Sequence, residues 1–108
     1  MSRYVINILA SRDLNDIGTY FAENNIEAGE RFFQAFNRKC KQLVSFPKSG
    51  TSYAEVRYGI RGLSIDSYIL FYRILEDGVE ILRVINGRRD FSDLFDEFNE
   101  IGSTSCET

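Results

Sequence analysis

Apolar residues along the first part of the chain follow the period of a strand and then that of a helix. Residues 4–9, YVINIL, place apolar side chains on both faces of a predicted strand, which is typical of a strand covered on both sides. We expect Ser11 to cap the helix that follows, with Asp13 in its first turn, where the helix dipole favours an anion. Apolar residues then recur at helical spacing up to Asn24-Asn25: Leu14, Ile17 and Phe21.

A second helical pattern starts at once and ends before Pro47. Asn24 and Glu27 have the spacing of a capping box, and proline cannot continue a helix. Because the connection is so short, we expect an antiparallel helical hairpin that packs on the strands that follow. Phe33 lies outside the main apolar stripe of this helix, so an exposed Phe33 would indicate a surface that binds a partner. The stripe itself is rich in phenylalanine: Ala28, Phe32, Ala35, Phe36, Cys40, Leu43 and Val44.

The rest of the chain is dominated by strand patterns. One or two short strands are predicted within residues 54–65, and an almost continuous apolar strand within residues 67–75. Asp77-Gly78 is a two-residue hairpin signal, and residues 79–86 form the returning strand. Directly opposed residues share a face of the sheet, so this loop predicts Tyr72 and Arg83 on one face and Arg73 on the other. The predicted pairs are Tyr72 with Arg83, Arg73 with Leu82, and Ile74 with Ile81.

The order of these elements predicts an α+β fold. An N-terminal strand and an antiparallel two-helix hairpin would pack on a curved, mainly antiparallel sheet. A short amphipathic C-terminal helix is predicted from Phe91 to Phe98. We expect residues 1–98 to form a single domain, since the 108 residues suffice for one modest core, and residues 99–108 to be a flexible acidic and polar tail.

Composition narrows the class of protein. With 44% hydrophobic and 27% charged residues, the chain has the balance of an ordinary globular domain. No apolar run reaches transmembrane length, and the N-terminal residues lack the layout of a secretory signal. We therefore expect a cytoplasmic protein whose two cysteines, Cys40 and Cys106, stay reduced. Since the chain has no histidine and only two cysteines, we expect no metal site, and we also expect no cofactor.

Charge is distributed unevenly along the chain. Residues 1–89 hold all 13 Lys and Arg residues and 10 of the acids, whereas residues 90–108 hold six acids and no base. Six arginines gather in the strand region: Arg57, Arg61, Arg73, Arg83, Arg88 and Arg89. The planar guanidinium suits phosphate and carboxylate groups, so the cluster predicts an anionic partner. The alternative is a set of surface arginines paired with neighbouring acids.

Patterns typical of enzymes are sparse. The commonest general base, histidine, is absent, and neither cysteine has a neighbouring histidine to make it a nucleophile. Gly59 and Gly62 do not form a phosphate-binding loop and indicate turns or a bulge. Four tyrosines of the strand region offer hydroxyls or stacking surfaces, although core packing is their commoner role: Tyr53, Tyr58, Tyr68 and Tyr72.

Five segments occur in an order and spacing that resemble a known family: DLNDIGTYFAENN, FPKSG, EVRYGIRG, YILFYRI and ILRVINGRRD. Together they cover roughly residues 4–95 and resemble the toxin subunits of RelE/ParE toxin–antitoxin modules, more narrowly the ParE, or plasmid-stabilisation, branch. The resemblance implies two helices against a curved antiparallel sheet, and a toxin that a cognate antitoxin holds inactive. The antitoxin's C-terminal part would wrap the toxin, and its dimeric N-terminal half would bind operator DNA, so this chain would not itself bind a specific DNA sequence.

Branches of this family differ in target, since RelE-like members cut mRNA on the ribosome and ParE-like members poison DNA gyrase. By the resemblance, Arg89 matches the catalytic arginine of the RelE-like nucleases. Phe95 stands where they carry a catalytic tyrosine, and Ile69 where they carry another arginine. Many ParE-like sequences have histidine at the position of Asn86.

These comparisons favour a ParE-like gyrase poison that is a binding protein rather than an enzyme. We expect Arg83, Asn86, Arg88 and Arg89 to bind the target. Three further arginines are expected to bind carboxylates of a ParD-like antitoxin dimer in a hetero-oligomer, or to support the sheet: Arg57, Arg61 and Arg73. Two alternatives are a RelE-like ribosome-dependent endoribonuclease, with Arg89 stabilising phosphate charge, and a degenerate member that binds an antitoxin without being toxic.

Overall fold

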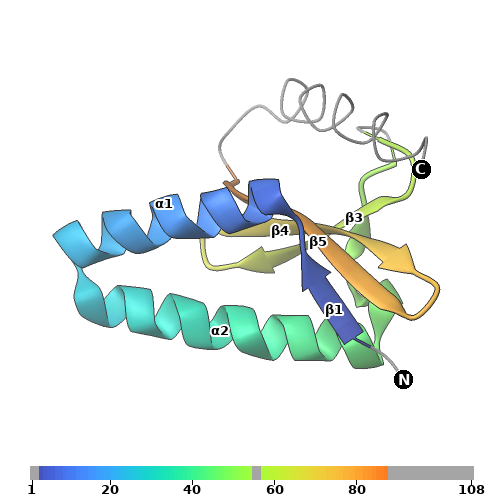
Figure 1. Ribbon diagram of the computed structural model, residues 1–108, viewed down its shortest axis with the longest axis horizontal. Helices are drawn as coiled ribbons and strands as arrows, with labels where there is room; N and C mark the ends of the chain where they lie inside the picture. Colours follow the sequence, from blue (N-terminus) through green and yellow to red (C-terminus); the bar gives the residue numbers. More distant parts are fainter. Residues whose placement is uncertain (1–2, 55–56, 88–108) are drawn as a thin grey trace.

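The computed structural model, which describes residues 3–54 and 57–87, has a helical hairpin packed on a five-stranded sheet (Figure 1). The strand order is β1-β5-β4-β3-β2, with β1 parallel to β5 and the other pairs antiparallel. The predicted α+β class is confirmed, and the predicted C-terminal helix from Phe91 to Phe98 lies outside the described residues. The elements are β1 (Arg3–Ile6), α1 (Ile8–Asn24), α2 (Ile26–Ser45), a 3₁₀ turn η1 (Pro47–Ser49), β2 (Thr51–Ser52), β3 (Ile60–Ile65), β4 (Tyr68–Leu75) and β5 (Gly78–Asn86).

The chain passes from β1 to α1 through Asn7, earlier than predicted. The side chain of Asn7 accepts a hydrogen bond from the backbone N–H of Leu9 at 2.9 Å and so caps the helix. The prediction of Ser11 as the cap is therefore wrong, and so is the prediction of a strand up to residue 9. The reason is that the polar Asn7 ends the strand although apolar residues lie on both sides of it. Asp13 consequently lies beyond the first turn of α1, which contains no acid.

Asn25 joins the two helices of the hairpin. Its backbone N–H donates to the carbonyl of Phe21 at 2.7 Å, and its side chain accepts from the N–H of Ala28 at 3.1 Å. One residue thus ends α1 and caps α2, so the predicted cap at Asn24 is wrong by one position. The predicted antiparallel hairpin is confirmed (Figure 1).

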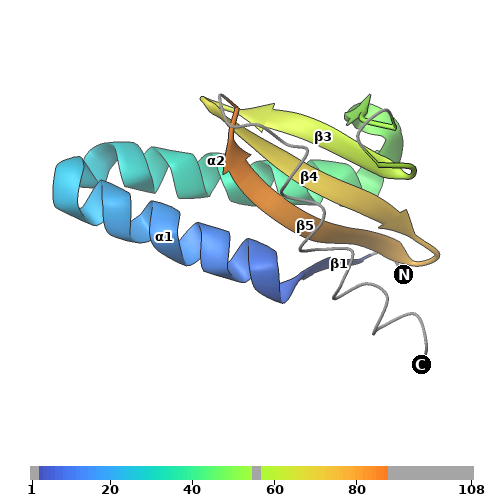
Figure 2. The ribbon, with the colours of Figure 1, turned by 90° about the horizontal axis from the view of Figure 1, so that it is seen from above.

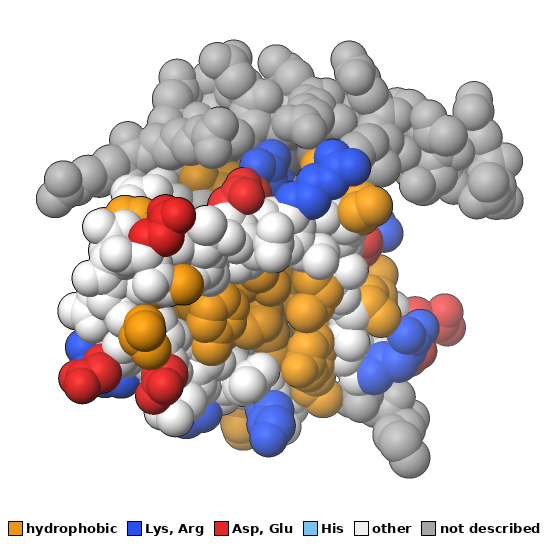
Figure 3. Space-filling model, turned by 60° about the vertical axis from the view of Figure 1, so that its left-hand side comes forward, with side chains coloured by type: hydrophobic (Ala, Val, Ile, Leu, Met, Phe, Trp, Pro, Cys, Tyr) orange, Lys and Arg blue, Asp and Glu red, His pale blue; other side chains and the backbone are white. Residues whose placement is uncertain are grey.

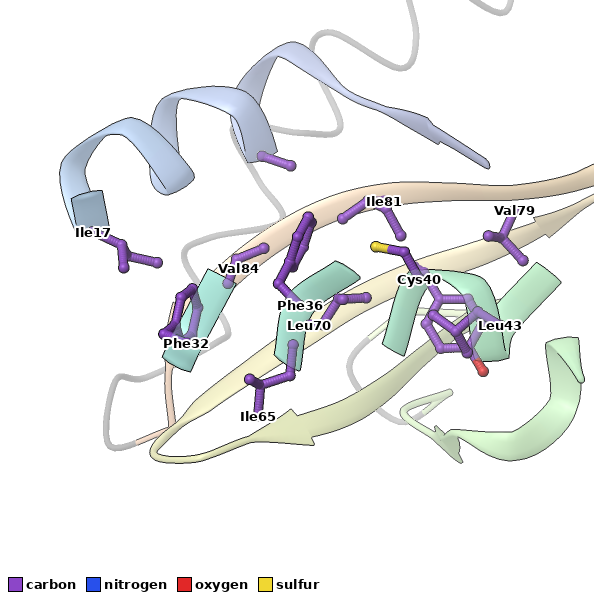
Figure 4. Close-up of a cluster of buried hydrophobic side chains, with 12 residues drawn as sticks. Ile17, Phe32, Phe36, Cys40, Leu43, Ile65, Leu70, Val79, Ile81 and Val84 are labelled. Atoms are coloured by element: carbon purple, nitrogen blue, oxygen red, sulfur yellow. The ribbon is translucent and has the colours of Figure 1, made fainter. Parts of the chain in front are cut away.

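The main core lies between the hairpin and one face of the sheet (Figure 4). From α2 it takes most of the predicted apolar stripe, and each large apolar side chain buried in this way contributes about 1.5–3 kcal/mol. Tyr72 of β4 is also fully buried here. The core residues are Ala10, Ile17, Phe32, Phe36, Cys40, Leu43, Ile65, Leu70, Tyr72, Val79, Ile81 and Val84.

A second, smaller core lies on the other face of the sheet. Successive residues of a strand point to opposite faces, and Phe71 belongs to the second core whereas Leu70 and Tyr72 belong to the first. We call this set the second-face cluster, and it consists of Leu9, Ile60, Phe71, Leu82 and Ile85, with Tyr53 and Ile69 packed against it.

The β4–β5 hairpin turns one residue earlier than predicted. Leu75 pairs with Gly78, so Glu76 and Asp77 form the loop and Gly78 begins β5. Glycine is required at position 78 because the backbones of β5 and β1 approach closely there: a Cβ at Gly78 would lie 1.7 Å from the carbonyl oxygen of Arg3 in β1. The three predicted pairs are wrong for this reason: the observed pairs are Tyr72 with Ile81, Arg73 with Glu80, and Ile74 with Val79.

A β-bulge then shifts the register of the same hairpin. Tyr72 pairs with Ile81 and Phe71 pairs with Arg83, so Leu82 is an extra residue on β5. The predicted sharing of one face by Tyr72 and Arg83 is wrong, because the bulge sets Arg83 opposite Phe71. This shift places Arg83 where its guanidinium contacts Asp13 of α1.

Candidate functional site

Arg83 is held by Asp13 of α1 at the edge of β5. The Nε of Arg83 donates to one carboxylate oxygen at 2.8 Å and Nη2 donates to the other at 3.0 Å. The Arg83 side chain is only 7% exposed and that of Asp13 14%, so the pair is largely withdrawn from solvent. Two parallel hydrogen bonds of this kind give a strong and geometrically specific ion pair.

The same carboxylate also binds the backbone of β5. β1 pairs with β5 only as far as Ile81, so beyond that point the edge of β5 away from β4 has no neighbouring strand among the described residues. The backbone N–H of Val84 donates to Oδ2 of Asp13 at 3.0 Å, which satisfies a donor that a longer β1 would have paired. Among the predicted target-binding residues, the structure therefore places Arg83 in a buried support of the strand.

Arg61, predicted to bind antitoxin, holds the loop between α2 and β2. Its Nε and Nη2 donate to the carbonyl of Gly50 at 3.2 and 2.8 Å, and Nη2 also reaches the carbonyl of Lys48 at 3.2 Å. The hydroxyl of Tyr72 donates to the carbonyl of Pro47 at 2.6 Å and accepts from the N–H of Gly50 at 3.0 Å. Arg61 and Tyr72 thus fix the turn that follows α2 onto the sheet.

Arg57 and Arg73, the other two predicted antitoxin-binding residues, come together at one cavity. Both line a hollow of about 260 Å³ at the edge of the second-face cluster, beside Ile60 and Leu82. Arg73 also pairs with Glu80 at 2.6 Å, in an exposed ion pair across β4 and β5. The structure therefore groups two of the three predicted antitoxin arginines and separates Arg61 from them.

Asn86 ends β5 on the surface, opposite Tyr68 of β4. Its predicted companions Arg88 and Arg89, and Phe95, lie outside the described residues. Ile69, which the resemblance set at the position of an arginine in the RelE-like nucleases, packs against the second-face cluster. That position therefore provides apolar contact instead of a positive charge.

An apolar groove between the two helices was missed by the sequence analysis. It has a volume of about 420 Å³ and is lined by Gly18, Phe21, Ala22, Ile26, Gly29, Glu30 and Phe33. Figure 3 shows a band of apolar side chains on this side of the molecule. Phe33 is half-buried there, with its ring packed edge-on to Phe32 at 5.1 Å, instead of standing free. The available signal was the pair of glycines inside the two helical patterns, since Gly29 lets α2 approach Phe21 closely.

A second apolar hollow lies at the C-terminal end of α2. It has a volume of about 980 Å³ and is lined by Gln42, Ser45, Phe46, Pro47, Lys48, Ser49 and Ile74. Phe46 is 67% exposed at its rim, and Ile74 of β4 is also exposed. Exposed apolar side chains that gather in one place are typical of an interaction surface.

The described residues offer little for covalent chemistry. Cys40 is buried in the main core, and burial raises the pKa of its thiol to about 12, so it is an unreactive core residue. No group of three or more His, Cys, Asp or Glu residues in the described ranges is arranged to hold a metal ion. The helices of residues 3–54 and 57–87 are also too short or too polar to cross a bilayer.

Comparison with known proteins places these features in a family. The family described as the ParE toxin of the type II toxin–antitoxin system ParDE matches residues 4–91. Toxin ParE1 of Mycobacterium tuberculosis is 28% identical over 91 residues, which cover 82% of this chain and 93% of the relative. Toxin ParE3 of Caulobacter vibrioides is 26% identical over 93 residues, covering 85% of this chain and 93% of the relative.

A solved structure has the same fold. A chain described as part of the chromosomal ParDE toxin–antitoxin system from P. aeruginosa superposes with a TM-score of 0.67 at 19% sequence identity. The match covers 80% of this chain and 96% of that chain. The arrangement of helices and strands is thus the one found in a chain of that system.

Proposed function

Because the chain belongs to the ParE toxin family of type II toxin–antitoxin systems, we propose that it poisons DNA gyrase and that a cognate antitoxin neutralises it. The observation that carries the proposal is the family match, which runs from β1 through the segment with Arg88 and Arg89. The toxin would bind gyrase while the enzyme holds cleaved DNA, so that the break is not resealed. This action requires a binding surface but no catalytic group on the toxin.

The target-binding surface would be the C-terminal end of β5 with the two arginines that follow it. Asn86 is exposed there, and Arg88 and Arg89 come directly after the strand in the sequence. Guanidinium groups at this edge would meet carboxylates of gyrase or phosphates of its DNA. Arg83 would contribute indirectly, because its ion pair with Asp13 holds the strand that leads to them.

The antitoxin would cover exposed apolar surface and neutralise positive charge. Ile26 in the groove between the helices and Phe46 at the end of α2 are both about two-thirds exposed, at 64% and 67%. These are sites for apolar side chains of an antitoxin helix or extended segment. Arg57 and Arg73 at their shared cavity would receive antitoxin carboxylates, whereas Arg61 would support the loop.

The test uses purified toxin, freed of any antitoxin, with supercoiled plasmid, gyrase and ATP. After denaturation and electrophoresis, linear DNA that forms only when both proteins are present is the expected result. Adding the co-purified antitoxin back should abolish it. Unchanged supercoiling, with no linear product at any toxin concentration, would reject the gyrase proposal.

The ribonuclease alternative is tested in the same preparation with ribosomes and mRNA. Phe95 and Ile69 lack the hydroxyl and charge that the RelE-like nucleases use at the matching positions, so we expect no cleavage. If cleavage occurs, Phe95→Tyr should increase it, because a tyrosine hydroxyl would restore the missing group. Absence of both activities would leave a degenerate member that retains antitoxin binding.

A further inference from the structure

The outer face of α2 carries charged side chains at the border of the molecule. In Figure 1, α2 forms the lower border of the described chain, and in Figure 2 it runs behind the sheet. One side of the helix is buried in the main core, and the opposite side is exposed. Across residues 3–54 and 57–87, the charged members of this exposed stripe form no ion pair. The stripe consists of residues three or four positions apart: Glu27, Glu30, Gln34, Arg38 and Lys41.

The two signs of charge are separated along the helical hairpin. Residues 13–30 hold five acids and no base, whereas residues 31–54 hold five bases and no acid. The helix dipole accounts for an acid in the first turn of α2, such as Glu27, but its effect fades within one turn. Glu30 lies beyond the first turn, and the last turn contains no base. The dipole therefore does not explain most of the stripe, which instead suits a partner that carries both signs in the opposite order.

We propose that this stripe binds a second copy of the chain, with the two α2 helices packed antiparallel about a two-fold axis near Ala35. A two-fold contact joins the same surface of both copies, so a residue before Ala35 meets one at a similar distance after it. The acids Glu27 and Glu30 of one copy then face bases of the other. Those bases are Lys41 and Arg38, and the same contacts recur at the other end of the stripe. A partner of a single charge would be attracted to one half of the stripe and repelled by the other.

An apolar contact fits the same arrangement. Ile26 is 64% exposed at the start of α2. Val44 follows eighteen residues later, which is about five turns, so both lie on the same side of the helix. Each is nine residues, or about 13 Å, from Ala35, so the two-fold axis sets Ile26 of one copy against Val44 of the other. Val44 lines a hollow of about 460 Å³ with Arg3, Tyr4, Lys41 and Ser45, a lining that includes no acid.

Sedimentation velocity of the purified full chain, freed of any antitoxin, tests the self-association. We expect a dimer at micromolar concentration in low salt. High salt should dissociate it, because the paired charges lie at the surface, where ions screen them. A chain that stays monomeric in low salt at its highest soluble concentration would overturn the proposal.

Charge-swapped variants show whether the two ends of the stripe meet. Glu27→Lys with Glu30→Lys makes the stripe basic, and Arg38→Glu with Lys41→Glu makes it acidic. Each variant alone should be monomeric where the unchanged chain is dimeric, and their equimolar mixture should form a heterodimer. All four side chains are exposed, so circular dichroism should show both variants folded. Folded variants that dimerise alone, or that do not associate when mixed, would overturn the antiparallel arrangement.

A matched pair of isoleucine variants tests the apolar contact. Ile26→Ser should weaken self-association by about tenfold or more, because it removes a side chain that the contact buries. Ile74→Ser, at an exposed isoleucine of β4, should leave it unchanged. Equal effects of the two changes would show that Ile26 does not make the contact. The proposed antitoxin surface also includes Ile26, so antitoxin binding would separate the two copies, whereas the self-association itself does not depend on gyrase as the target.

Discussion

The carboxylate of Asp13 binds both the guanidinium of Arg83 and the backbone N–H of Val84, and so attaches α1 to the edge of β5 that faces away from β4. The two residues are 70 positions apart in the sequence. Their contact lies where the pairing of β1 with β5 ends. Beyond that point α1, in place of β1, lies beside this edge of β5. The end of β5 that leads to Arg88 and Arg89 is therefore fixed through this ion pair.

Asp13→Ala should destabilise the fold by about 3–5 kcal/mol, because it leaves a buried guanidinium and a strand N–H without their acceptor. The free energy of unfolding from urea titrations measures this effect. Asp16→Ala is the matched control, since Asp16 is an exposed acid of the same helix, and it should change stability by less than about 0.5 kcal/mol. Equal effects of the two changes would show that the ion pair is not a determinant of stability.

Tyr72→Phe should cost about 1–3 kcal/mol, although the ring stays in place. The change removes the hydroxyl that links the Pro47 carbonyl to the Gly50 N–H, and both backbone groups then lose a partner. Amide hydrogen exchange should rise selectively at Gly50. Tyr58→Phe, in an exposed loop, is the control and should be neutral; an unchanged exchange rate at Gly50 in Tyr72→Phe would contradict the role of the hydroxyl.

Gly78→Ala should be among the most damaging single changes in the sheet. The new methyl group would lie 1.7 Å from a backbone oxygen of β1, and neither strand moves aside cheaply. Thermal unfolding should show a large loss, and the variant is expected to lose the pairing of β1 with β5. Gly18→Ala, where the methyl group would meet only Phe33 at 3.7 Å, should instead be neutral or stabilising by about 0.5–1 kcal/mol. A mild effect of Gly78→Ala would argue against the close approach.

The sequence predicted the elements better than their ends. Helical spacing and the short connection at Asn24-Asn25 identified the hairpin, because these signals are local. The prediction of the β4–β5 register was wrong because Asp77-Gly78 matches the sequence of a common two-residue turn. Position 78 instead requires glycine because it lies against the backbone of Arg3, which is 75 residues away in the sequence. No local pattern reports such a contact.

The arginines of the candidate site show the same limit of prediction from local sequence patterns. Their number and clustering predicted an anionic partner, but only the fold reveals what each guanidinium already binds. Arg83 faces a carboxylate of α1, Arg61 faces backbone carbonyls, and Arg73 pairs with Glu80 while sharing a cavity with Arg57. The bulge at Leu82 decides the position of Arg83, and bulges depend on pairing between strands rather than on one strand's own sequence.

Stability should fall in alkaline solution partly because of Cys40. Burial raises the pKa of its thiol from the ordinary value of 9.0 to about 12, so between these two pH values the unfolded chain loses a proton that the folded chain keeps. Deprotonation then favours the unfolded state, and the contribution is present below pH 9 and lost as the pH rises toward 12. Cys40→Ala should flatten this part of the curve of unfolding free energy against pH. An unchanged slope would show that the thiol does not titrate differently in the two states.

Arg89→Ala should lower the yield of linear DNA in the gyrase assay by roughly tenfold or more, since loss of a charge-assisted contact costs about 1.5–3 kcal/mol. Antitoxin affinity should be unchanged, because the proposed antitoxin surface lies on the helices and at the cavity of Arg57 and Arg73. Arg31→Ala, an exposed arginine of α2, is the control and should leave the yield of linear DNA unaltered. Isothermal titration with the antitoxin, run beside the cleavage assay, separates the two surfaces. If Arg89→Ala weakens antitoxin binding and leaves gyrase poisoning intact, the end of β5 belongs to the antitoxin interface, and the target contact must be sought elsewhere.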